Sequence, residues 1–171
     1  MSRRARARFD RRVILNPVAV AIEHAQKLRT EDRANLQRIV EQALHDFRTG
    51  RDCAAQWCTM ADALNTAETL AGMGIVSDDD SRDRISHAQQ VLADVHRRHA
   101  ERGTWALRGP ELQALDDGLW VHRVQLEHCS LGEFERARRD TAERLRQARA
   151  GNAPAGARIV EGPAAAARTA R

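Results

Sequence analysis

The sequence predicts an all-α protein: an antiparallel bundle of five to six helices, with a disordered N-terminal arm and a disordered C-terminal tail. Three observations predict this fold. Apolar residues recur every three or four positions through residues 13–150, no segment alternates with period two for long, and glycine or proline separates the periodic segments. A chain of 171 residues that is 42% hydrophobic has room for one core without disulfides, so residues 13–150 are expected to form a single domain.

The first half of the domain predicts three helices. Pro17 suits the first turn of a helix that runs to about residue 28, and Thr30 caps a second that runs to about residue 48. A third helix, over residues 52–71, is ended by Gly72. The expected buried faces are, in order, Val18, Ala21, Ile22 and Ala25; Leu36, Ile39, Val40, Ala43, Leu44 and Phe47; and Trp57, Met60, Ala61, Leu64, Ala67, Leu70 and Ala71.

The second half predicts three more helices. Ser77 and Asp80 indicate a capping box for a fourth helix that runs to about residue 102. Pro110 opens a fifth helix, and Ser130 with Glu133 indicates a capping box for a sixth that runs to about residue 150. The expected buried faces are Ile85, Ala88, Val91, Leu92 and Val95; Leu112, Leu115, Leu119, His122, Leu126 and Cys129; and Phe134, Ala137, Thr141, Leu145 and Ala148.

The positive charge of the chain lies at its two ends. The formal net charge is +4, but residues 1–12 hold six Arg and one Asp, and residues 151–171 hold three Arg and one Glu. The remaining 19 basic and 22 acidic residues leave the body, residues 13–150, at −3. Both ends lack a buried stripe and are predicted to be disordered. The arm is the predicted binding site for nucleic acid or an acidic partner, through Arg3, Arg4, Arg6, Arg8, Arg11 and Arg12.

Cysteine usage and hydropathy bear on location. Cys53, Cys58 and Cys129 are odd in number and form no CxxC pair, which is typical of free thiols in a reducing compartment. The apolar run 13–22 contains Asn16 and Pro17, so we do not expect a secretion signal. No stretch is long and apolar enough to predict a membrane span or a membrane partner, and a cytoplasmic location is expected.

No motif predicts catalysis, a metal site or a cofactor. The seven histidines include no Glu-x-x-His or His-Glu-x-x-His pattern, and no nucleophile elbow or glycine-rich phosphate loop is present. His122 lies on the apolar face of the fifth helix and is expected to be a hydrogen-bonded core histidine, with Asp116 or Asp117 as a partner. An enzyme or metal protein that uses His122, one of these aspartates and His128 is the least favoured alternative.

Two sets of residues are candidates for protein contact. Trp120 is off the main apolar stripe, so it either packs against a neighbouring helix or is an exposed anchor, and it is the candidate protein-interaction residue. Asp62, Asn65 and Glu68 follow one another at three-residue spacing on the third helix. They form either a solvated flank or a partner surface.

Two stretches carry a family resemblance. SRRARARFD at the start, and TWALRGPELQALDDGLWVHRVQLEHCSLGEFERA, resemble small helical proteins encoded in proteobacterial prophages and other integrated elements, which share an arginine-rich start and a GPE-x-x-AL segment. The resemblance covers most of residues 1–148. It implies a cytoplasmic, mobile-element setting and assigns no activity and no site residues.

These observations favour a non-enzymatic helical interaction or accessory protein, whose arm contacts nucleic acid or an acidic partner. The alternative is a purely protein-binding bundle that self-associates as a homo-oligomer through an apolar helix face and has no nucleic-acid role. The two hypotheses differ in whether removal of residues 1–12 abolishes partner binding.

Overall fold

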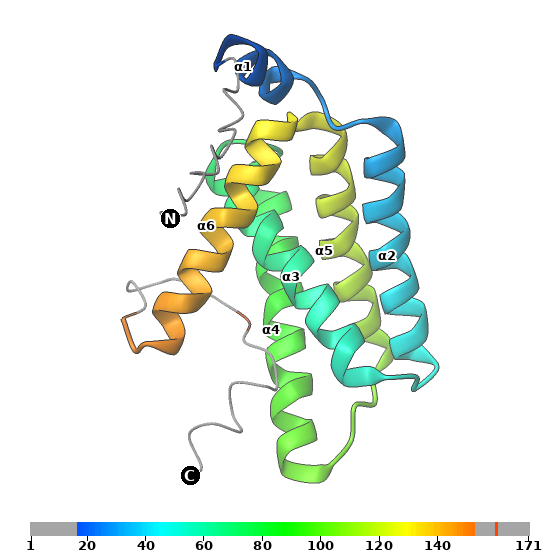
Figure 1. Cartoon of the computed structure of the whole chain (residues 1–171). Helices are drawn as coiled ribbons and strands as arrows, with labels where there is room; N and C mark the ends of the chain where they lie inside the picture. Colours follow the sequence, from blue (N-terminus) through cyan, green and yellow to red (C-terminus); the bar gives the residue numbers. More distant parts are fainter. Residues whose placement is uncertain (1–16, 153–159, 161–171) are drawn as a thin grey trace, which may run out of the picture.

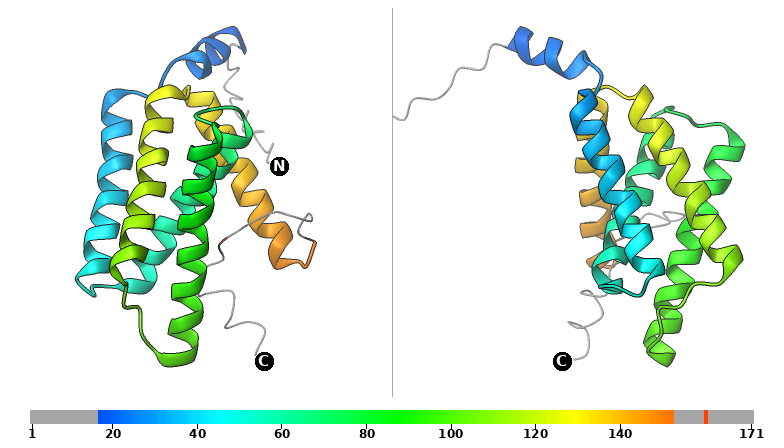
Figure 2. Two further views of the ribbon diagram at one scale, coloured as in Figure 1. Left: turned by 180° about the vertical axis from the view of Figure 1, so that it is seen from behind. Right: turned by 90° about the vertical axis from the view of Figure 1, so that its right-hand side faces the viewer.

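The computed structural model describes residues 17–152 and residue 160, and this part of the chain folds into six α-helices without a strand (Figure 1). From α2 to α6 consecutive helices run in alternating directions (Figure 2). The predicted all-α class and antiparallel arrangement are therefore confirmed. The helices are α1 (Pro17–Ala25), α2 (Thr30–Arg48), α3 (Cys53–Gly72), α4 (Asp79–Arg102), α5 (Gly109–His128) and α6 (Leu131–Arg149).

Helix α3 is the centre of the body, because it packs against α2, α4, α5 and α6. Alanine and threonine occupy many of its positions, and these small side chains let four neighbours approach on different sides. Its large residues Trp57, Met60, Leu64 and Leu70 are fully buried. The indole Nε1 of Trp57 donates a hydrogen bond of 2.9 Å to the carbonyl of Leu92 in α4, so the polar atom of this core side chain is also satisfied.

The first helix differs from its prediction in length and in burial. It ends at Ala25, and the chain leaves the helix so that Leu28, 7% exposed, can enter the core. Leu131 donates its backbone N–H to the carbonyl of Gln26 at 2.8 Å, which ties this connection to the start of α6. The predicted buried face of this helix is wrong, since Val18 is 64% and Ile22 is 59% exposed.

The helix caps of α4 and α6 and the buried face of α2 can also be compared with the prediction. The N-cap of α4 is Asp78, whose carboxylate accepts from the Ser81 amide at 2.9 Å and the Ser81 hydroxyl at 2.7 Å, so the capping box predicted from Ser77 is wrong. Ile39, expected in the buried stripe of α2, is 45% exposed. The capping box of Ser130 and Glu133 at the start of α6 is confirmed.

Candidate functional site

The two ends of the chain, predicted to be disordered, differ in what the structure describes of them. The six arginines of the arm lie outside the described residues, so their role stays a prediction. Most of the tail also lies outside them, but Val160 is described and is 7% exposed. Its side chain joins the largest hydrophobic cluster, which contains residues of α2, α3, α4 and α5. Sequence reasoning found no packed residue in 151–171, and Val160 corrects it.

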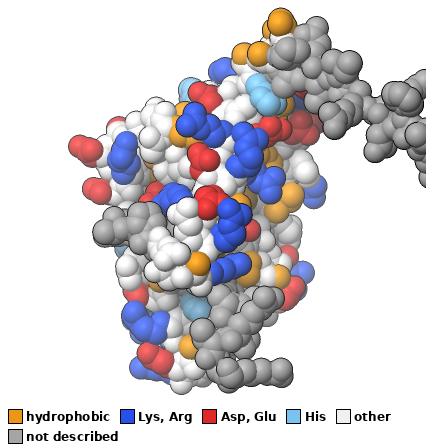
Figure 3. All heavy atoms as spheres, turned by 60° about the vertical axis from the view of Figure 1, so that its left-hand side comes forward, with side chains coloured by type: hydrophobic (Ala, Val, Ile, Leu, Met, Phe, Trp, Pro, Cys, Tyr) orange, Lys and Arg blue, Asp and Glu red, His pale blue; other side chains and the backbone are white. Residues whose placement is uncertain are grey.

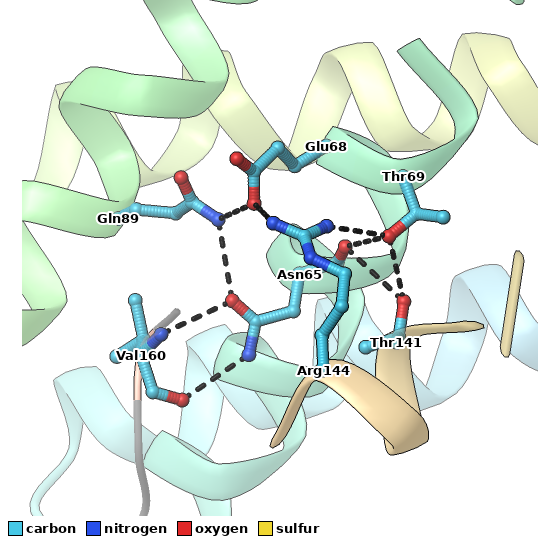
Figure 4. Close-up of polar contacts among 7 residues, drawn as sticks. All are labelled: Asn65, Glu68, Thr69, Gln89, Thr141, Arg144 and Val160. Carbon is cyan, nitrogen blue, oxygen red and sulfur yellow. Dashed lines mark hydrogen bonds and ion pairs between the residues drawn. The ribbon is translucent and has the colours of Figure 1, made fainter. Parts of the chain in front are cut away.

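Asn65 of α3 binds the backbone of Val160 through both polar atoms of its side-chain amide (Figure 4). Its Nδ2 donates to the Val160 carbonyl at 3.1 Å, and its Oδ1 accepts from the Val160 N–H at 3.2 Å. Asn65 is only 1% exposed, so both hydrogen bonds form away from water. An amide side chain that pairs with the N–H and C=O of one residue binds main chain, whatever side chain that residue carries.

A network of polar residues from α3, α4 and α6 surrounds this contact (Figure 4). Gln89 of α4 donates to Asn65 Oδ1 at 3.2 Å and to Glu68 Oε2 at 3.3 Å. Arg144 of α6 pairs with Glu68 at 3.0 Å and donates to the Thr69 hydroxyl at 3.0 Å. The guanidinium and carboxylate of this network thus neutralise each other.

The polar stripe predicted on α3 therefore divides into two parts. Asp62 is exposed, as expected of a solvated flank. Asn65 and Glu68 instead face neighbouring elements of the same chain, where they hold Val160, Gln89 and Arg144. A signal for the tail contact is present in the sequence, because Ile159 and Val160 are the only large apolar residues in 151–171.

Trp120 and His122 line the same cavity between α2 and α5. Trp120 is 46% exposed, and the guanidinium carbon of Arg84 in α4 lies 5.9 Å from the centroid of its ring. His122 is 6% exposed, which confirms its predicted burial, and this burial lowers its pKa to about 4. Its Nδ1 has no hydrogen-bond partner, so the expected hydrogen-bonded core histidine is wrong at this atom. Asp117 accepts instead from Gln113.

His96 and His99 belong to an aromatic cluster that sequence reasoning missed. Both side chains lie on α4 and are half-buried. The ring of His99 stacks on Trp105 with centroids 4.0 Å apart and planes at 16°. The His96 ring lies 5.2 Å from Trp57, and burial lowers the His96 pKa, with His99 as a second cause. The connector that carries Trp105 thus folds back onto α4.

The charged side chains of the surface are mixed in sign. On the face that α6 contributes, Arg and acidic side chains alternate, with hydrophobic side chains of α1 at its upper end (Figure 3). Pairs such as Arg136–Asp140 and Arg139–Glu135, one helical turn apart, place opposite charges side by side. This face therefore carries charges of both signs, with Arg more frequent than acidic residues along α6.

The cysteines and the possible metal ligands of the described residues were also compared with the requirements of a reactive thiol and of a metal site. Cys129 is buried, which raises its pKa to about 11, and burial also raises the pKa values of Cys53 and Cys58, so the thiol form of each is favoured over the thiolate. Among residues 17–152 and 160, no three His, Cys, Asp or Glu side chains are grouped to hold a metal ion, and no helix is long and apolar enough to cross a bilayer. No protein-family model, curated protein or solved structure matches the chain.

Proposed function

We propose that the chain is a non-enzymatic helical interaction protein whose Arg-rich arm adds electrostatic contact to nucleic acid or to an acidic protein partner. The observation that carries the proposal is the separation of charge. Six Arg and one Asp within residues 1–12 give +5, against −3 for residues 13–150. A partner with dense negative charge is attracted to the arm, while the mildly acidic body contributes no comparable attraction.

Polar residues of α3, α4 and α6 contact one another and the main chain of Val160 within the body. The charged residues of this network pair with each other, as Arg144 of α6 does with Glu68 of α3. The same network binds the main chain of Val160 through Asn65. The polar groups of this network therefore hold segments of the same chain together.

The test is a binding titration of the full chain and of a chain without residues 1–12 against a fluorescent DNA duplex and an RNA strand of equal length. If the arm makes five to six phosphate contacts, the slope of log K against log salt is about −5. Replacement of one arm arginine by glutamine lowers the magnitude of the slope by about one. A parallel pull-down from lysate identifies acidic protein partners.

Two matched variants separate charge from other effects. Replacement of all six arm arginines by lysine keeps the charge and is expected to keep the salt slope. Arg168→Gln with Arg171→Gln removes two charges from the other end and is expected to change the slope far less. Equal recovery of every partner by the full and the arm-deleted chains ends the proposal.

A second candidate function is self-association of the body. Trp120 on α5 and Ile39 on α2 are both nearly half exposed, and large exposed apolar side chains are frequent at protein interfaces. Sedimentation velocity of the full chain and of Trp120→Ala tests it, since a dimer that dissociates on this substitution supports self-association. A monomer at every concentration excludes it.

The setting of the protein remains a prediction alongside its function. The three free cysteines support the proposal of a cytoplasmic location, and the resemblance of the arm and the GPE-x-x-AL segment supports the proposal of a mobile-element origin. Genes for replication, packaging or regulation beside the coding sequence support the mobile-element setting, and housekeeping neighbours contradict it.

A further inference from the structure

The cavity between α2 and α5 combines apolar walls with two polar atoms that nothing satisfies. Helix α2 packs mainly against α3 and less against α5, which leaves space on its α5 side. The cavity has a volume of about 130 Å³. Its apolar walls come from Val40 and Leu44 of α2 and from Leu119 and Leu126 of α5. The lining residues recur every three or four positions on each helix, so each helix contributes one face.

The polar atoms are contributed by one residue from each helix. His122 of α5 and Gln37 of α2 both line the cavity. His122 Nδ1 and Gln37 Nε2 are both buried, and neither has a hydrogen-bond partner. A buried polar atom left unpaired costs about 1–3 kcal/mol, and buried polar groups in folded proteins are nearly always paired. Two residues that each carry such an atom line one cavity, and this favours a molecule there that pairs with their side chains.

The protonation state of His122 defines the kind of group that fits. Burial lowers its pKa to about 4, so the imidazole is neutral at pH 7. One ring nitrogen of a neutral imidazole accepts and the other donates, while the amide nitrogen of Gln37 donates. A hydroxyl, which both donates and accepts, satisfies such a pair. A carboxylate or an ammonium group has no buried counter-ion here, since Glu41 and Arg123 pair with each other at 3.6 Å.

Access to the cavity is provided by exposed side chains. The side chains of Glu41 and Arg123 are 65% and 46% exposed, and Trp120 is 46% exposed. In contrast Leu126 is 1% and His122 is 6% exposed, so they form the inner end. The polar atom of His122 therefore lies deep, behind a rim that faces solvent.

We propose that this cavity binds one small neutral molecule of single-ring size, apolar over most of its surface, whose one hydroxyl pairs with His122 and Gln37. The cavity, at about 130 Å³, is close in size to the apolar cavity of about 150 Å³ that holds one benzene, so the ligand is limited to a single ring. The cavity is formed by residues of α2 and α5, and the proposal does not rest on the role of the arm.

The experiment titrates the full chain with phenol and, in parallel, with benzene, and follows the ring signals of His122 by NMR. Phenol carries the hydroxyl and benzene lacks it, so phenol is expected to bind at least about tenfold more tightly. His122→Leu keeps an apolar side chain of similar size and removes the polar atom. In this variant the preference for phenol is expected to disappear, with benzene bound at least as well.

A second variant and a control keep the outcome decisive. Val40→Phe puts a ring into the cavity from a half-buried position and is expected to abolish binding of both probes, with the helix content unchanged by circular dichroism. His87→Leu, an exposed histidine on α4, is expected to bind phenol like the unchanged chain. Failure of phenol to shift the His122 signals overturns the proposal, because the cavity then binds no such ring. Equal affinity of phenol for the full chain and for His122→Leu also overturns it, because His122 then does not pair with the hydroxyl.

Discussion

Asn65 and His122 are both buried polar residues on helices, and they differ in how their polar atoms are satisfied. Asn65 donates to and accepts from Val160 and accepts from Gln89. His122 Nδ1 has no partner. A satisfied polar group stabilises one arrangement of the chain, whereas an unsatisfied one costs free energy that a ligand can recover. This contrast separates a structural residue from a candidate binding residue.

The buried His122 makes the free energy of unfolding depend on pH. Its pKa in the folded chain is lowered to about 4 from an ordinary value of 6.5, so the unfolded chain binds the additional proton between these pH values. Stability at His122 is therefore complete above pH 6.5 and is lost as the pH falls towards 4, by about 3 kcal/mol in total. Urea unfolding at pH 7 and at pH 4 measures this loss.

His122→Leu provides the comparison for this measurement. The variant keeps Glu41, Asp116 and Arg123, the charged groups that line the same cavity, so the difference between the two chains isolates the imidazole. The unchanged chain is expected to lose about 3 kcal/mol more than the variant between pH 7 and pH 4. Equal losses in the two chains would contradict the lowered pKa, because His122 would then take up its proton in the folded chain as readily as in the unfolded chain.

Asn65 is expected to control the attachment of Val160. Asn65→Leu keeps the size of the side chain but removes both hydrogen bonds to the Val160 backbone, which destabilises the chain by about 2 kcal/mol. Amide hydrogen exchange at Val160 is expected to accelerate at least about tenfold. The exposed Asp62→Ala, one turn earlier on α3, is the control and is expected to leave this exchange rate unchanged.

At the scale of elements, the packing of α4 on α5 is the most extensive in the body, and a glycine permits it. A Cβ at Gly118 of α5 overlaps Cβ of Ala88 in α4 and lies 3.1 Å from the carbonyl oxygen of Arg84 and 3.2 Å from Cδ2 of Leu64. The two helix backbones are therefore closer than any larger side chain allows.

Gly118→Ala is expected to destabilise the chain by about 2–3 kcal/mol, although alanine favours helix more than glycine does. Thermal and urea unfolding measure the change. Gly109→Ala, at the start of the same helix, has open space around the added methyl group and serves as the control, with little loss expected. Ala88→Gly is expected to restore part of the stability in the double variant. An unchanged midpoint for Gly118→Ala means that α4 and α5 can separate without cost.

The sequence predicts the helices themselves well and their ends less well, for physical reasons. The bounds of α2 lie close to the prediction, but the predicted capping by Thr30 is wrong, because Arg29 is the N-cap and Thr30 is the first residue of the helix. The start of α4 is misplaced by one residue, because three successive aspartates follow Ser77 and any of them can cap. Helix α1 ends early because Leu28 is drawn into a tertiary cluster, which local periodicity does not reveal.

At the scale of the whole molecule, the sites depend on contacts between distant parts of the sequence. His122 and Trp120 were identified from one helix, but the cavity they share requires α2, 76 to 85 residues earlier at Gln37 and Leu44. Asn65 meets Val160 across 95 residues. Periodicity within a helix predicts which face is buried, but the partner of that face is determined by the packing of helices.

The same packing predicts a gradient of local stability across the molecule. Helix α3 contacts four other helices, whereas α1 packs against α6 alone among the helix pairs with substantial contact. Amide exchange in α3 is therefore expected to require global unfolding, and α1 is expected to exchange at least about 100-fold faster. Gly132→Ala sharpens the test, because its added Cβ lies 2.9 Å from both Cβ and the carbonyl oxygen of His24 and pushes α1 away from α6. Exchange should then accelerate in α1 and stay unchanged in α3. Protection of α1 equal to that of α3 contradicts this gradient and makes α1 part of the cooperative body.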